Sequence, residues 1–177
     1  MLQQFQSKQG KPYKVLFVCL GNICRSPTAD GVFQEKLLQA DLADALECDS
    51  AGTSAWHIGE PPDARSTEHA ARRGFKLDHL RARQVEVDDF YEFDLILAMD
   101  QQNLEDLETL QAEAKRQAVS RSREAKAQLA LFLDHPHANE LGRSVPDPYH
   151  GGARGFDEVL DLVEEACEGW LAAVKEA

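Results

Sequence analysis

The feature that most constrains this fold is an apolar strand that runs straight into a loop and a helix start. Residues 14–19, KVLFVC, form a short apolar run typical of the inner strands of parallel sheets. The loop CLGNICRS follows, and Ser26 and Pro27 predict the N-cap and first position of a helix. A parallel strand needs a crossover to reach its neighbour, so this segment predicts a βαβ arrangement.

The rest of the chain repeats this alternation. Further strands are predicted at residues 45–52, 93–100 and 128–133, and helices at residues 28–38, 63–73, 100–110 and 156–174. The pattern predicts an α/β fold, in which a single domain has a four-stranded parallel sheet with helices on both faces. Ligands of such sheets bind at the carboxyl ends of the strands, and Cys19 lies at one of these ends.

Length and composition are those of one globular domain. The chain has 177 residues, of which 43% are hydrophobic, and this is enough to bury a core. We expect residues 1–13 to be a flexible N-terminal lead-in and residues 14–177 to form the folded domain. The stretch at about 111–126 is polar and rich in alanine, which predicts either a solvated helix or a mobile insertion.

The formal net charge of −12 argues against nucleic acid or an anionic membrane as the main partner, because both favour positive protein surfaces. No stretch approaches the roughly 18 apolar residues of a membrane span, and the N-terminus lacks the apolar core of a signal peptide. These features predict a cytoplasmic protein, and because thiols are usually reduced in the cytoplasm, its four cysteines need not form a disulfide framework. Cys48 and Cys167 lie in apolar patterns and are predicted to be packing residues.

The loop from Cys19 to Ser26 has the composition of an anion site. Its backbone N–H groups and the start of the following helix favour negative charge. The planar guanidinium of Arg25 matches two oxygens of a phosphate group. The same field should favour the thiolate form of Cys19, which would be a nucleophile beside a bound phosphoryl group.

Two simpler interpretations of the loop explain less. In the first, Cys19 is a buried strand residue and Arg25 is a surface charge, which leaves the coincidence of loop, cap and arginine without a cause. In the second, Cys19 and Cys24 bind zinc, which needs two further ligands, and His135 and His137 are the candidates.

A second motif, VPDPYHGG, could supply the proton that a leaving alkoxide or phenoxide needs. Asp147 stands between Pro146 and Pro148, whose rings partly fix the shape of the loop. A carboxylic acid there could act as a general acid over the pocket, and Tyr149 could stack on an aromatic leaving group. A DPY triplet alone is more often a turn, but its pairing with the first loop favours catalysis.

The sequence resembles the low-molecular-weight protein tyrosine phosphatases. VLFVCLGNICRSPTADGVF is similar to the N-terminal signature of that family, with Asp30 where glutamate is usual. The motifs DSAGT, WHIGEPPDAR, ARQV, FDLILAMDQQNL and DPYHGG follow in family order. The resemblance covers residues 14–177, apart from the insertion at about 111–126, and implies a phosphatase domain that hydrolyses phosphotyrosine in proteins and small aryl phosphates.

The resemblance implies the catalytic roles. Cys19 is the nucleophile that becomes phosphocysteine, and Asp147 protonates the leaving group and then activates water. Phosphate is bound by the side chain of Arg25 and by the backbone N–H groups of Leu20, Gly21, Asn22, Ile23, Cys24 and Arg25.

The resemblance also implies residues that support the loop. Asn22 holds the loop shape through a bond to Ser50. Ser26 donates a hydrogen bond to the thiolate, and Asp100 orients the arginine.

Trp56 and Tyr149 are implied to wall the entrance and grip the phosphotyrosine ring. Cys24 is similar to the family's second loop cysteine, which forms a reversible disulfide with Cys19 and protects it from over-oxidation. Neither a metal nor a cofactor is implied. The expected partner is a tyrosine-phosphorylated protein, with a tyrosine kinase among the candidates, and the expected state is a monomer or weak dimer.

Some further positions bear on the family pattern. Leu80 stands where many relatives have a histidine, with His79 one position earlier, so that His79 is a candidate replacement. His150 follows Tyr149 where many relatives have a second aromatic residue. Ile23 stands where a phosphoarginine-specific branch carries threonine, which favours phosphotyrosine as the substrate.

Rival functions fit the sequence less well. An arsenate reductase on the same fold needs further cysteines in the middle of the chain, and none stands between Cys48 and Cys167. The larger phosphatase families place a histidine before the cysteine, where this chain has Val18. A non-catalytic phosphate-binding module would be expected to lack the nucleophile or the acid, and both are present.

Overall fold

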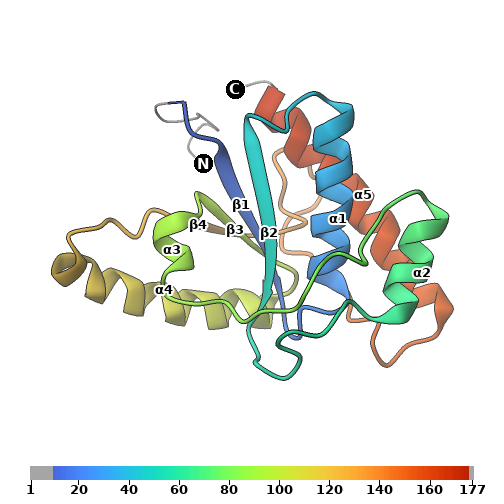
Figure 1. Cartoon of the computed structure of the whole chain (residues 1–177), viewed down its shortest axis with the longest axis horizontal. Coiled ribbons are helices and arrows are strands. Elements are labelled where there is room, and N and C mark those ends of the chain that lie inside the picture. The colour runs from blue at the N-terminus through green and yellow to red at the C-terminus, as the bar shows by residue number, and fades with distance from the viewer. Residues whose placement is uncertain (1–9, 176–177) are drawn as a thin grey trace.

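Four parallel strands form one sheet in the computed structural model, which describes residues 10–175 (Figure 1). They are β1 (Tyr13–Cys19), β2 (Leu46–Gly52), β3 (Leu95–Ala98) and β4 (Gln128–Leu131), in the spatial order β2-β1-β3-β4. All three neighbouring pairs are parallel. The predicted sheet is confirmed, and each strand end agrees with the prediction to within two residues.

The register of the sheet brings three chain segments to one edge. β1 ends with Cys19 opposite Gly52 of β2, and near its end Val18 lies opposite Ala98 of β3. The chain therefore leaves all three strands at the same edge. The loop after β1 lies between the segments that follow β2 and β3, which is the usual ligand position in a parallel sheet.

Helices cover both faces of the sheet, as predicted (Figure 1). On one side lie α1 (Arg25–Gln39), α2 (Ala64–Arg72) and α5 (Ala153–Lys175); on the other lie α3 (Asp89–Glu92) and α4 (Gln101–Arg121). The alternation of side chains along β1 serves both faces. Phe17 packs edge to face against Phe33 and Phe132 on the first side, whereas Leu16 packs with Leu107 on the second.

The predicted N-cap of the first helix is wrong. α1 begins at Arg25, its N-cap residue is Cys24, and no side chain caps it. Ser26 lies inside the helix and is fully buried, because its hydroxyl contacts the sulfur of Cys19 and the side chain of Asn22. The residue that the sequence marks as a helix start is used by the loop instead.

The polar stretch after residue 110 continues the helix that precedes it. α4 runs to Arg121 and ends at Ser122, which has a left-handed backbone with φ 50°. The short helix α3, which the sequence pattern did not predict, packs against this added part of α4. The hydroxyl of Tyr91 donates to the carbonyl of Ala114 at 2.5 Å. Arg123, just beyond the helix, pairs with Glu92 at 2.6 Å. Of the two predicted alternatives, the structure shows a helix over most of the stretch.

Two expectations concern the termini and membranes. Residues 1–9 of the predicted flexible lead-in lie outside the described residues, and β1 already begins at Tyr13. Within residues 10–175, no helix combines the length and the apolar character that a bilayer crossing requires.

Candidate active site

The loop after β1 packs directly onto the end of β2. Thr53 donates its backbone N–H to the carbonyl of Cys19, and Ser54 donates to that of Leu20, both at 2.9 Å. Gly52 permits this approach, since a Cβ at that position would lie 2.7 Å from the carbonyl oxygen of Leu20. The loop is therefore shaped by contact with a neighbouring strand end.

Asn22 fixes the turn of the loop from a left-handed conformation with φ 55°. Its side-chain amide donates to the hydroxyl of Ser26 at 2.8 Å and accepts from the backbone N–H of Arg83 at 3.0 Å. The resemblance implied a bond between Asn22 and Ser50. In the structure the side chain of Asn22 instead pairs with Ser26 and Arg83.

Cys19 is buried, with 3% of the residue exposed, and its sulfur faces two polar groups. The backbone N–H of Asn22 donates to it at 3.3 Å, and the hydroxyl of Ser26 lies 3.0 Å away. Because that hydroxyl already accepts from Asn22, its own proton can point to the sulfur or to the carbonyl of Ala51 at 3.3 Å. Donors directed at a sulfur stabilise its negative form.

Arg25 is buried and held by the chain on the opposite side of the loop. Its Nη1 donates to Asp100 at 2.6 Å and to the carbonyl of Val145 at 3.1 Å. Asp100 is itself fixed, because it caps α4 by accepting from the N–H of Asn103 at 2.8 Å. Burial opposes the charge of the guanidinium, but the neighbouring Cys19 and Asp100 outweigh it, so the pKa of Arg25 is raised. The arginine therefore stays cationic.

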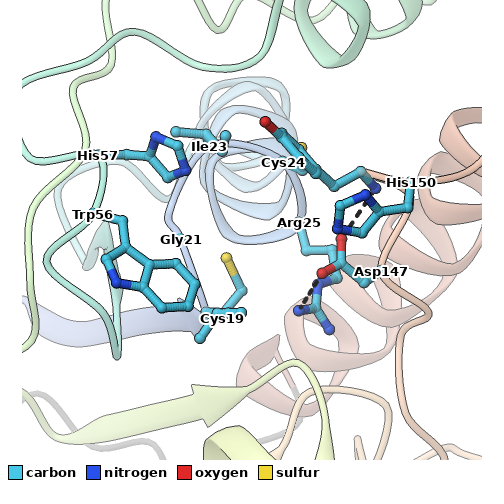
Figure 2. A pocket seen from close by; sticks show the side chains of 11 residues that line it. Cys19, Gly21, Ile23, Cys24, Arg25, Trp56, His57, Asp147 and His150 are labelled. Atoms are coloured by element: carbon cyan, nitrogen blue, oxygen red, sulfur yellow. Dashed lines mark hydrogen bonds and ion pairs between the residues drawn. The ribbon is translucent and has the colours of Figure 1, made fainter.

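These side chains line a cavity of about 400 Å³ at the carboxyl edge of the sheet (Figure 2). Figure 2 shows Trp56 and His57 on one wall, with Asp147 and His150 on the opposite wall and the sulfur of Cys19 between them. The lining residues are Cys19, Leu20, Gly21, Ile23, Cys24, Arg25, Trp56, His57, Asp147, Tyr149 and His150. The residues predicted to be catalytic or to bind the substrate thus all line this cavity, except Asn22.

Asp147 reaches into this cavity from the loop before α5. One carboxyl oxygen lies 3.6 Å from Nη2 of Arg25, and the other accepts from the backbone N–H of Tyr149 at 3.1 Å. The side chain is 43% exposed, so it can exchange protons with solvent. The exposed faces of Trp56 and Tyr149, at 73% and 39%, leave two aromatic surfaces at the entrance.

Cys24 differs from Cys19 although both cysteines line the cavity. Cys24 lies in a small apolar cluster with Ile23, Ala82 and Phe156. Burial is the main reason that the pKa of its thiol is raised to about 12, against a smaller opposing effect of a hydrogen bond with Ser66. Cys24 is therefore a protonated thiol at neutral pH.

Sequence reasoning missed two basic residues around the site. His57 lies over the loop, where a Cβ on Gly21 would be 3.1 Å from its ring, and its Nδ1 lies 2.7 Å from Glu60. Arg83, whose backbone supports Asn22, is locked by carboxylates: Nε donates to Asp49 at 3.0 Å. The ARQV and WHIGEPPDAR motifs contain both residues, but their partners are set by the tertiary structure.

Two candidate histidines, His79 and His135, and Asp30 of the signature motif are not among the residues that line the cavity. His79 contacts Gln34 of α1 at 3.2 Å, and Gln34 donates in turn to Asp30 at 2.8 Å. Asp30 is buried, and this burial raises the pKa of its carboxyl group. His135, a candidate zinc ligand, packs against Gly169 of α5. Within residues 10–175, no three histidine, cysteine or acidic side chains are grouped as a metal site would require.

Known proteins match this chain over most of its length. Residues 14–177 match the family model described as low molecular weight phosphotyrosine protein phosphatase. A protein of Streptomyces coelicolor named low molecular weight protein-tyrosine-phosphatase is 44% identical over 164 residues, which cover 93% of this chain and 94% of that protein.

Solved structures agree with these sequence matches. The crystal structure of YfkJ from Bacillus subtilis superposes with a TM-score of 0.81 at 37% identity, covering 96% of this chain and 98% of that one. A protein tyrosine phosphatase from Entamoeba histolytica, solved with Hepes in its active site, gives a TM-score of 0.79 at 36% identity, covering 93% and 97% of the two chains.

Proposed function

The chain belongs to the low-molecular-weight phosphotyrosine protein phosphatase family, and from this membership we propose that it hydrolyses phosphotyrosine in proteins through a phosphocysteine intermediate. It is an enzyme, a low-molecular-weight protein-tyrosine-phosphatase. One observation carries the mechanism: the buried sulfur of Cys19, the guanidinium of Arg25 and the carboxyl group of Asp147 line the same cavity. Small aryl phosphates are expected to be substrates as well.

In the first step the thiolate of Cys19 attacks phosphorus and the bond to the phenolic oxygen breaks. The leaving oxygen takes the proton of Asp147, so that a neutral phenol departs and the phosphoryl group stays on sulfur. The guanidinium of Arg25 and the N–H groups of residues 20–25 surround the phosphoryl oxygens, where negative charge is concentrated in the transition state. The hydroxyl of Ser26 stabilises the thiolate before attack and again when it is released.

In the second step water replaces the cysteine. Asp147, now ionised, removes a proton from a water molecule as that water attacks phosphorus, and the sulfur of Cys19 leaves as a thiolate. The products are inorganic phosphate and the enzyme in its starting state, with Asp147 protonated again. The 43% exposure of this side chain supports the role, because the acid must meet both a bulky leaving group and a water molecule.

The shape of the entrance supports an aromatic substrate. Trp56 and Tyr149 offer ring surfaces on the cavity walls, against which a phosphotyrosine ring could stack. The apolar side chain of Ile23 also lines the cavity. Phosphotyrosine is therefore expected to be a better substrate than phosphoarginine, whose specific enzymes carry threonine at this place.

The expected partner is a tyrosine-phosphorylated protein, and a tyrosine kinase is one candidate. We expect the enzyme to act in the cytoplasm as a monomer or weak dimer. Four free cysteines support a reducing compartment.

The first prediction concerns the nucleophile. Hydrolysis of p-nitrophenyl phosphate in the presence of EDTA should proceed in the native enzyme and fall by a factor of about 10³ or more in Cys19→Ser, since serine lacks the activated thiolate. The same variant should still bind a phosphotyrosine peptide, because the loop N–H groups and Arg25 remain. Activity that survives in Cys19→Ser, or that appears only with a divalent cation, would contradict the mechanism.

A further inference from the structure

We propose that Arg65 is a positioning residue that holds the loop of Asp147 in place over Cys19, an inference that rests on the proposed function. Arg65 lies in the first turn of α2 and does not line the cavity. Its guanidinium joins two segments that both contact the site: the start of α2, which is bonded to the loop after β1, and the segment that carries the acid.

On one side, Arg65 is fixed to the loop after β1 through Asp63. Its Nε and Nη2 donate to the two carboxylate oxygens of Asp63 at 3.0 and 2.9 Å. Asp63 also caps α2 by accepting from the backbone N–H of Arg65, and its own N–H donates to the carbonyl of Ile23 at 2.7 Å. The hydrogen bond from Arg65 is the main reason that the pKa of Asp63 is lowered, so this carboxylate stays charged.

On the other side, Arg65 holds Tyr149 by both backbone and ring. Nη2 donates to the carbonyl oxygen of Tyr149 at 3.1 Å, and the guanidinium carbon lies 5.5 Å from the centre of the tyrosine ring. Phe156 provides a second surface, with its ring centre 4.8 Å from the same carbon. Cation–π contacts at such distances hold the guanidinium plane between two rings.

Tyr149 passes this restraint to the acid. Its backbone N–H donates to one carboxyl oxygen of Asp147, while the other oxygen faces Arg25. The contacts thus lead from Ile23 through Asp63, Arg65 and Tyr149 to Asp147. The path closes at Arg25, which belongs to the same loop as Ile23 and faces Asp147. Within the acid loop the backbone of Gly151 bonds back to Pro148, whereas the bond at Tyr149 reaches another element.

A lysine could not reproduce these contacts. The Nη2 group of Arg65 has two hydrogens in one plane and directs them to different acceptors, Asp63 and Tyr149. Lysine carries its donors on a single tetrahedral nitrogen and lacks a flat surface to stack between rings. The geometry therefore requires the arginine fork and not only a positive charge.

The inference predicts a loss that depends on the leaving group. A misplaced acid matters most when the departing oxygen is strongly basic, because such a group must be protonated to leave. In Arg65→Ala, kcat/KM for phenyl phosphate should fall about 10-fold, a part of the 10²–10⁴ that a general acid contributes, and for p-nitrophenyl phosphate by less than about 3-fold. In Arg65→Lys, kcat/KM should also fall more for phenyl phosphate than for p-nitrophenyl phosphate, but by a smaller factor.

Two measurements distinguish a misplaced Asp147 from a general disturbance of the site. Inhibition by inorganic phosphate should stay within about 2-fold of native, because Arg25 and the loop N–H groups bind phosphate without the acid. The matched control is Arg72→Ala, since Arg72 is exposed on the same helix and donates to Glu68 of that helix. That variant should leave both kcat/KM values unchanged.

Asp147→Asn separates this inference from the proposed mechanism. If Asp147→Asn shows a strong leaving-group dependence and Arg65→Ala shows none, Arg65 does not position the acid and the mechanism stands. An equal loss on both substrates in Arg65→Ala, together with weaker phosphate inhibition, would also overturn the inference. If Asp147→Asn itself lacks leaving-group dependence, the proposed role of Asp147 fails.

Discussion

The two cysteines of the loop after β1 have opposite environments, because their sulfur atoms contact different kinds of groups. The sulfur of Cys19 faces an N–H and a hydroxyl, whereas Cys24 packs among apolar side chains and has a thiol pKa of about 12. Nucleophilic attack needs a thiolate, so only the first is suited to it. The sequence distinguished the two by spacing, but it could not show the burial that keeps Cys24 protonated.

At this scale we predict reversible inactivation by peroxide. The peroxide should convert Cys19 to its sulfenic acid, and the thiol of Cys24 should then condense with it, forming a disulfide and releasing water. Both cysteines line the same cavity. Dithiothreitol should restore most of the activity of the native enzyme and little of that of Cys24→Ser.

Mass spectrometry of the inactivated enzyme provides the check. A linked peptide pair containing Cys19 and Cys24 is expected in the native protein. If Cys19 carries only sulfonic acid and no linked peptide is found, Cys24 does not protect it. The raised pKa of Cys24 predicts that the condensation is slow at neutral pH and faster as the pH rises.

At the scale of the elements, the sequence predicted those parts of the site that come from consecutive segments of the chain. The strand β1, the loop after it and the helix α1 follow one another along the chain, so their pattern is visible in the sequence. The predicted cap at Ser26 failed because a long-range demand, the support of Cys19 and Asn22, outweighed the local preference of serine for a helix start. Tertiary contacts decided this helix boundary.

Contacts between distant elements could not be predicted. Arg83 reaches Asn22, and Arg65 reaches Tyr149 across 84 positions of the sequence, yet neither residue belongs to a local pattern that names its partner. The short helix α3 was missed for a similar reason. It spans only residues 89–92, and its hydrogen bond to α4 and its ion pair with Arg123, just beyond α4, exist only in the folded chain.

The packing of β2 against the loop yields a prediction at this scale. In Gly52→Ala the added Cβ would approach the carbonyl oxygen of Leu20 to 2.7 Å and the nitrogen of Asn22 to 3.1 Å, and both are backbone atoms that cannot move independently. Overpacking of this kind costs about 1–3 kcal/mol. We expect a lower melting temperature together with weaker inhibition by phosphate. Gly59→Ala is a comparison on the adjoining loop, where nothing lies within 4 Å but the φ of 84° adds backbone strain.

If Gly52→Ala binds phosphate as the native enzyme does, the loop does not depend on this close approach. Titration with phosphate, followed by inhibition of p-nitrophenyl phosphate hydrolysis, measures the binding. Gly59→Ala should lower stability through its backbone alone and leave phosphate inhibition unchanged.

The molecule as a whole has two cores, one on each face of a four-stranded sheet, and its site lies at the edge where both layers meet the strand ends. This architecture was predictable, since alternating apolar and helical segments admit few other arrangements. His135 belongs to the larger of the two layers. It is 6% exposed and packs so closely on Gly169 that a Cβ there would lie 2.0 Å from its ring.

Global stability should therefore depend on the protonation of His135. Burial lowers the pKa of this histidine, with His137 acting in the same direction and Glu165 and Asp134 opposing it. The unfolded chain then takes up a proton near the ordinary value of 6.5 that the folded chain resists, so stability is full above about pH 7 and falls as the pH drops below 6.5.

The comparison that isolates this effect is native against His135→Gln. Urea denaturation between pH 7.5 and 5.5 should show native stability falling more steeply than that of the variant, because other titrating groups contribute equally to both. Parallel curves over this range would mean that His135 takes no part in the pH dependence.

The bond from Arg25 to the carbonyl of Val145 spans 120 positions, and this has a consequence for how the enzyme is made. Synthesis proceeds from the N-terminus, so the cysteine loop leaves the ribosome long before the segment that anchors its arginine and carries its acid. A nascent chain that stops before residue 145 has Cys19, Arg25 and Asp100, but it lacks both the carbonyl of Val145 and the carboxyl group of Asp147. Phosphatase activity should therefore arise only after the segment that carries Asp147 has left the ribosome, and a growing chain that lacks this segment should not act on phosphotyrosine.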